Sequence, residues 1–227
     1  MRRTERRAPT EVAARGAAAT GRGMLIGTAM FAAVIVNTAL LGGYRIDGFG
    51  SVTGALEILG FMAAAAVTEE LLFRGVLFRI IEERIGTYLA LALTGLLFGL
   101  AHMANPDATL WGALAIAIEA GGMLAAAYAA TRTLWAPIGL HFAWNFAQGG
   151  VFGTQVSGNG ESEGLLDGTT SGPVLLSGGE FGPEASGYAV LAGAVLTITF
   201  LWLARRRGHV VPRRRRDRAA ATATPAQ

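Results

Sequence analysis

The sequence of 227 residues contains no cysteine and no lysine. The absence of cysteine excludes disulfide bonds, thiolate metal sites and cysteine nucleophiles. Charged residues are also scarce, at 15% of the chain against roughly a quarter in soluble domains. Hydrophobic residues make up 52%, more than a soluble fold of this length could bury. The composition therefore predicts a polytopic membrane protein.

Long apolar stretches predict an all-α fold, a polytopic transmembrane helix bundle with about six spans. A membrane-spanning helix needs roughly 20 mostly apolar residues. A sixth segment, at about 51–79, is longer than one span and contains an acidic pair. It is either one long tilted helix or a helix that breaks before that pair. The other five segments lie at residues 24–44, 88–104, 109–130, 134–150 and 188–204.

The positions of the arginines predict the orientation of the spans. With the N-terminus inside, the cytoplasmic segments hold 17 arginines and the outer segments hold only Arg45. This asymmetry is what the positive-inside rule describes, so both termini are expected to be cytoplasmic. Arginines before an apolar stretch also occur in signal peptides, but no small-x-small cleavage site follows here. The expected location is the cell membrane, in a bacterium the inner membrane.

These features divide the chain into three regions. Residues 1–23 form an arginine-rich cytoplasmic tail, residues 24–204 form the transmembrane domain, and residues 205–227 form a second arginine-rich tail that is expected to be disordered. The tails are expected to contact anionic lipids and no nucleic acid. The domain includes an outer loop at 149–187, rich in glycine and without arginine, which is expected to be irregular and partly mobile.

Three segments within the spans carry polar side chains that a bilayer disfavours. Ionisable residues at such depth are by default candidates for a functional site. They are Glu69, Glu70 and Arg74 in the first segment, Phe98 and His102 in the second, and His141 and Asn145 in the third.

Spacing within these segments is helical, because residues four apart lie on one face of a helix. Glu70 can therefore pair with Arg74, which leaves Glu69 free for other work. Phe98 can form a wall beside the imidazole of His102. The three polar faces make one site only if their helices pack together.

The helix that carries the second segment has a small-residue face. Gly95 and Gly99 are four residues apart, a spacing that lets another helix approach closely. If the helices converge, two imidazoles and a carboxylate can hold a divalent metal ion with an open position for water. A second carboxylate can then act as general base. This is the inventory of a hydrolase, although the HExxH signature is absent.

Each polar residue also has a simpler structural interpretation. Glu70 and Arg74 can form an ion pair that only fixes the bundle. A single membrane histidine is more often a packing residue than a ligand, and His209, among cytoplasmic arginines, is expected to be a bystander. Glu57 is expected to be structural or interfacial, and Glu119 could be either. The joint occurrence of the three segments, in order, is the stronger argument for a site.

The three segments resemble the motifs of the CPBP family of intramembrane proteases, which comprises the type II CAAX prenyl endopeptidases and bacterial Abi or bacteriocin-processing relatives. The motifs EExxxR, FxxxH and HxxxN stand here at residues 69–74, 98–102 and 141–145. The resemblance covers about residues 60–150. It implies that the domain at 24–204 is a protease domain that hydrolyses a peptide bond of a membrane-associated protein or peptide.

The resemblance also implies roles for the first motif. Glu69 would activate the attacking water as general base. Glu70 and Arg74 would hold the motif helix in register.

The histidine motifs would complete the site. His102 would bind a metal ion or orient the water, and His141 with Asn145 would complete the site or stabilise the oxyanion. The ligands of a divalent metal ion, with zinc as the first candidate, would be His102, His141 and Glu69. The motifs permit such an ion and equally permit a metal-free glutamate protease.

Two other functions are alternatives at this point. Intramembrane Glu, Arg and His residues also serve proton-coupled transporters, although no inverted repeat is evident in the sequence. A non-catalytic relative could keep the fold and act by binding, for instance in bacteriocin immunity. The complete motif set argues against such a loss of activity.

Overall fold

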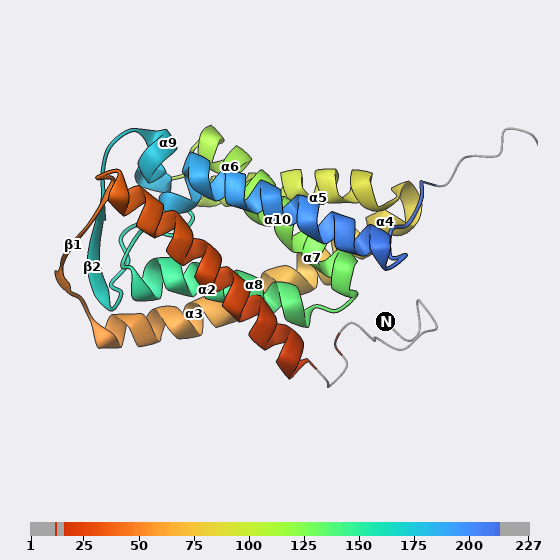
Figure 1. Cartoon of the computed structure of the whole chain (residues 1–227), viewed down its shortest axis with the longest axis horizontal. Helices are drawn as coiled ribbons and strands as arrows, with labels where there is room; N and C mark the ends of the chain where they lie inside the picture. The colour runs from red at the N-terminus through yellow and green to blue at the C-terminus, as the bar shows by residue number, and fades with distance from the viewer. Residues whose placement is uncertain (1–11, 13–15, 214–227) are drawn as a thin grey trace, which may run out of the picture.

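The computed structural model describes residues 12 and 16–213, most of which are helical (Figure 1). Two strands, β1 (Tyr44–Phe49) and β2 (Leu166–Thr170), pair antiparallel. The α-helices are α2 (Ala17–Leu40), α3 (Val52–Glu70), α4 (Arg79–Ile85), α5 (Thr87–Ala101), α6 (Leu110–Ile116), α7 (Met123–Thr131), α8 (Trp135–Asn145), α9 (Val174–Ser177) and α10 (Gly187–Arg206). The π-helical segments are Leu71–Phe78, Ala117–Gly122 and Phe146–Val151, and the 3-10 turns are His102–Ala104, Gly179–Phe181 and Pro183–Ala185.

The molecule is a membrane protein whose apolar helices form a bundle. Four helical segments in the described part of the chain are long and apolar enough to cross a membrane: Ala17–Leu40, Thr87–Ala104, Leu110–Thr131 and Gly187–Arg206. They correspond to four of the six expected spans. The segments expected at 51–79 and 134–150 are also helical but are not among these four. Six spans and cytoplasmic termini therefore stay predictions.

Helix α2 begins earlier than the sequence analysis placed it. Its first residue is Ala17, seven residues before the expected start, because the alanines at 17–19 are strong helix formers. Residues 17–23, assigned above to the tail, are thus helical. The helix ends at Leu40, before Gly42, whose φ of +76° no helix accommodates.

The long segment that carries the acidic pair is unbroken, which settles the two alternatives for it. Helix α3 runs to Glu70, the π-helical segment Leu71–Phe78 follows directly, and α4 continues to Ile85. A π-helical turn widens the helix locally, and such turns occur frequently at functional sites. Here the widening begins at the residue after Glu70.

The outer loop is more ordered than expected, and its strand β2 pairs with β1, which is a departure from an all-α fold. It contains β2, α9 and two 3-10 turns. The side chain of Phe181 is buried, and a Cβ atom at Gly112 would overlap its ring. Glu184 is also buried. Desolvation by this burial raises the pKa of the Glu184 carboxyl to about 7, while hydrogen bonding with Ser157 acts in the opposite direction.

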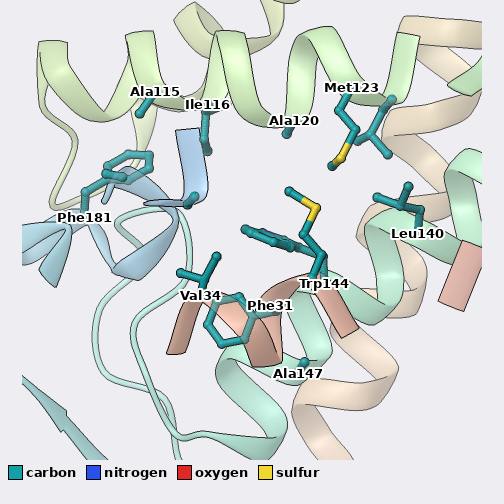
Figure 2. Packing of buried hydrophobic residues seen from close by; sticks show 14 of the residues in the cluster. Phe31, Val34, Ala115, Ile116, Ala120, Met123, Leu140, Trp144, Ala147 and Phe181 are labelled. Carbon is teal, nitrogen blue, oxygen red and sulfur yellow. The ribbon is translucent and has the colours of Figure 1, made fainter. Parts of the chain in front are cut away.

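The core lies where α2, α8 and the helical segment Leu110–Thr131 meet (Figure 2). The rings of Phe31 and Trp144 are in edge contact, with centroids 5.1 Å apart. Glycine allows this proximity, since a Cβ atom at Gly27 would lie 2.4 Å from the carbonyl oxygen of Leu140. On the outer surface of the bundle many large apolar side chains are exposed, as a lipid-facing surface requires.

The small-residue face on α5 packs as predicted. A Cβ atom at Gly99 would lie 2.1 Å from the carbonyl oxygen of Ala113, and one at Gly95 would lie 3.1 Å from that of Ala117. Both glycines therefore let α5 contact the backbone of the next helix, as small residues do in membrane bundles.

We expect Gly99→Ala to destabilise the protein by about 1–3 kcal/mol, the usual cost of overpacking. The matched control is Gly60→Ala on α3, where a Cβ atom would meet no atom of the described residues within 4 Å. Thermal unfolding in detergent measures the difference: the melting temperature should fall for Gly99→Ala and stay or rise for Gly60→Ala. Equal behaviour of the two variants would show that the α5 contact is looser than described.

Candidate active site

The carboxylate of Glu70 joins two of the three motifs. Its Oε1 accepts a hydrogen bond from Arg74 Nη1 at 2.6 Å and lies 2.9 Å from His141 Nδ1. All three side chains are at least 95% buried. The Glu70–Arg74 pair expected from helical spacing is therefore present, and the same oxygen also binds α8.

Arg74 connects this pair to the rest of the bundle. Its Nη2 donates to the carbonyl oxygens of Ala120 and Gly121 at 3.2 and 3.4 Å. The guanidinium carbon lies 4.5 Å from the ring centroid of Phe98 on α5, a distance at which cation–π attraction operates. One buried arginine thus contacts the first motif, the second motif and the helix between the second and third.

The two motif histidines form their hydrogen bonds through the same ring nitrogen, Nδ1. His102 Nδ1 lies 2.7 Å from the carbonyl oxygen of Phe98, which can only accept, so Nδ1 carries the proton. His141 Nδ1 donates to the Glu70 carboxylate in the same way. In a neutral imidazole this leaves Nε2 unprotonated as an acceptor. The predicted wall is also present, because the Phe98 and His102 ring centroids are 4.8 Å apart.

Glu69 lies between these histidines and a cavity. Its Oε2 is buried and has no hydrogen-bond partner in the part of the chain that the structure describes. It lies 3.9 Å from His141 Nε2, too far for a direct hydrogen bond. The side chain is 32% exposed and lines a half-open cavity of about 260 Å³ together with His102 and Asn145. A water molecule beside the gap can bond both Glu69 and His141.

The first and third motifs meet because α8 packs against the segment that carries the acidic pair. A Cβ atom at Gly75 would lie 3.2 Å from a methyl group of Leu134, the residue before α8. The start of α8 therefore contacts the π-helical segment directly after Arg74. His141 follows six residues after the start of α8, and its Nδ1 lies 2.9 Å from Glu70 Oε1.

Three other polar residues that the sequence singled out lie outside the cavity wall. Glu57 is exposed on α3, and His209 Nδ1 lies 3.0 Å from the carbonyl oxygen of Ala130. Glu119 is buried, and neither of its carboxylate oxygens has a hydrogen-bond partner in the described structure. None of the three is among the residues that line the cavity in the described part of the chain.

Most of the cavity wall was missed by sequence reasoning, including the loop residues Asn105, Val156, Ser157 and Asn159. Asn105 Nδ2 donates to the carbonyl oxygen of Ser157 at 2.6 Å. This contact joins two loops 52 residues apart, and neither loop carries a motif. No local pattern in the sequence could have indicated it.

The donors at the site match a divalent metal ion in kind. Glu69, His102 and His141 offer the oxygen and nitrogen ligands that zinc binds. Both histidines also bond through their second nitrogen, as metal-binding histidines usually do. Among residues 12 and 16–213, however, no group of three His, Asp or Glu side chains is arranged to hold such an ion.

We expect Arg74→Met to destabilise the protein by about 3–5 kcal/mol, because it leaves a buried carboxylate without its cation. The control is Arg45→Met, which removes an ion pair of the same 2.6 Å length with Asp47 at the surface and should change stability little. Denaturant unfolding of both variants in detergent measures the contrast. A small loss for Arg74→Met would mean that Glu70 is not held as a charged pair.

Comparison with known proteins found one family match. Residues 51–147 match the family described as type II CAAX prenyl endopeptidase Rce1-like, a segment of 97 of the 227 residues. All three motifs lie within it. A search of curated proteins and a search of solved structures each found no match. Over residues 51–147 the chain is thus similar to the type II CAAX prenyl endopeptidases, which supports its resemblance to the CPBP family of intramembrane proteases.

Proposed function

We propose that this chain is an intramembrane endopeptidase that hydrolyses a peptide bond of a membrane-associated protein or peptide with water activated by Glu69. The observation that carries the proposal is the position of Glu69. It is the carboxylate of the acidic pair that faces the cavity, and its buried Oε2 has no hydrogen-bond partner among the described residues, although His141 Nε2 is 3.9 Å away. Glu70, by contrast, is engaged by Arg74 and His141.

In the proposed reaction, Glu69 takes a proton from the water as its oxygen attacks the carbonyl carbon of the substrate. Nε2 of His102 or His141 accepts a hydrogen bond from the second hydrogen of that water and orients it. Glu69 then passes its proton to the leaving nitrogen, and the C–N bond breaks to give a carboxylic acid and an amine. The side-chain amide of Asn145 lines the same cavity and can donate to the oxyanion.

A divalent metal ion, with zinc as the first candidate, is the second part of the proposal. Glu69, His102 and His141 would hold it after moving closer together than they are in the described arrangement. When bound, such an ion would polarise the substrate carbonyl and lower the pKa of water. Anchorage of the arginine-rich tails on anionic lipids and location in the cell membrane complete the proposal.

We expect Glu69→Gln to abolish proteolysis, since general-base catalysis contributes about 10²–10⁴-fold. Glu57→Gln, an isosteric change on the exposed face of the same helix, should leave activity unchanged. The measurement is quantitative mapping of new protein N-termini in membranes that contain the wild type or either variant. Retention of the wild-type cleavage pattern by Glu69→Gln would contradict the assigned base.

The metal ion has its own test. Elemental analysis of the protein, purified in detergent without chelators, should find a divalent ion near one equivalent in the wild type and much less in His102→Ala and His141→Ala. The Glu57→Gln variant should retain the wild-type content. A folded wild type without metal would remove the ion from the proposal and leave the metal-free glutamate mechanism.

A further inference from the structure

We propose that the catalytic cavity receives its substrate from the non-cytoplasmic side of the membrane, and that the outer loop forms the wall of its mouth. The substrate would then be a short extended segment of a membrane protein, at the non-cytoplasmic end of a transmembrane helix. The identification of the bound segment as a substrate rests on the proposed function. The direction of entry rests on separate observations.

The first observation is where the cavity lies along the bundle. Its lining residues in the described chain stop at Phe73 on the segment that continues α3 and begin at Ala101 on α5. The stretch from Arg74 to the start of α5, which includes the turn between α4 and α5, contributes none of them. The cavity therefore extends from Glu69 toward the end of the bundle where α5 finishes.

The second observation is that the outer loop is fixed across this mouth. The amide of Asp107 donates to the carbonyl oxygen of Gly158 at 2.9 Å, and the amide of Gly158 donates to that of Phe181 at 2.8 Å. Gln155 Nε2 also donates to Asp107 Oδ2 at 2.8 Å. These bonds hold Val156, Ser157 and Asn159 in the wall, so this part of the loop forms a fixed side of the cavity.

The third observation is the distribution of charge between the two ends of the molecule. Figure 1 shows β1 and β2 at one end and α4 with the last turns of α10 at the other. Contacts define the second end: Arg132 bonds Glu82 on α4 at 2.5 Å, and Arg207 bonds the carbonyl oxygen of Ala130 at 2.9 Å.

Seven of the ten arginines at described positions belong to the elements of this second end. The end with β1 and β2 has Arg45, whereas its loop carries acidic residues. By the positive-inside rule the arginine-rich end faces the cytoplasm, so the mouth faces away from it. The seven are Arg79, Arg84, Arg132, Arg205, Arg206, Arg207 and Arg213.

The lining of the cavity indicates the chemistry of the substrate. Phe61, Met62 and Val156 supply apolar surface, and the amides of Asn105 and Asn159 can bond a peptide backbone. No lysine, arginine or aspartate is among the lining residues of the described chain. At about 260 Å³ the cavity is below the roughly 300–1,000 Å³ of sites for drug-sized ligands. It suits a few residues with small or apolar side chains in an extended conformation.

Because the chain has no cysteine, single cysteines report the direction of access without background. Ala65→Cys probes the inside of the cavity and Asn159→Cys its rim. Phe49→Cys on β1 and Glu83→Cys on α4, both exposed, are controls for the two ends. Each full-length variant is placed in spheroplasts of a bacterial host and treated with a charged, membrane-impermeant methanethiosulfonate.

We expect labelling of the cysteines at 65, 159 and 49 in intact spheroplasts, and labelling at 83 only after the membrane is opened. Labelling at 83 but not at 49 in intact spheroplasts would overturn the orientation. Labelling at 49 without labelling at 65 would overturn the route into the cavity, whether or not the rim at 159 reacts. None of these outcomes depends on catalysis, so a Glu69→Gln protein that still cleaves would remove the proposed function and leave the direction of access standing.

Discussion

A single carboxylate oxygen, Oε1 of Glu70, accepts from Arg74 and contacts His141 at hydrogen-bond distance. An unpaired charge at this depth would cost several kcal/mol, so the rest of the site must satisfy it. Arg74 supplies the opposite charge and is itself held by backbone carbonyls of the helix between the second and third motifs. His141 supplies a donor from α8. The other groups with catalytic chemistry keep their positions because this buried centre fixes the helices around them.

Two features of the backbone allow so many polar groups to meet in an apolar bundle. The π-helical segment Leu71–Phe78 begins directly after Glu70, between the acidic pair and Arg74. Glycines at 27, 95 and 99 let helices approach to backbone contact, which small residues make possible in membranes. Glu69, the neighbour of the buried carboxylate, is thereby left facing the cavity. Glu70 points into the bundle and Glu69 into the cavity because adjacent residues on a helix point about 100° apart.

What could be predicted from the sequence was mainly local. The Glu70–Arg74 pair, the Phe98–His102 contact and the glycine face on α5 all follow from a spacing of four on one helix. Contacts between distant segments could not be predicted in the same way. The sharing of Glu70 with His141, 71 residues away, depends on the packing of α8 against α3 in the folded bundle. The loop residues at 156–159 reach the cavity through hydrogen bonds that no motif encodes, and the pairing of β1 with β2 has no signal in the apolar pattern.

The most direct test of this account is the proton position on the histidines. The chain has only three, so nitrogen-15 NMR of histidine-labelled protein gives a spectrum that single substitutions can assign. We predict that His141 carries a proton on Nδ1, where it bonds Glu70, and that Glu70→Gln changes the signal of this nitrogen. A His141 without a proton on Nδ1, or one that is unaffected by Glu70→Gln, would contradict the central role given to the Glu70 carboxylate.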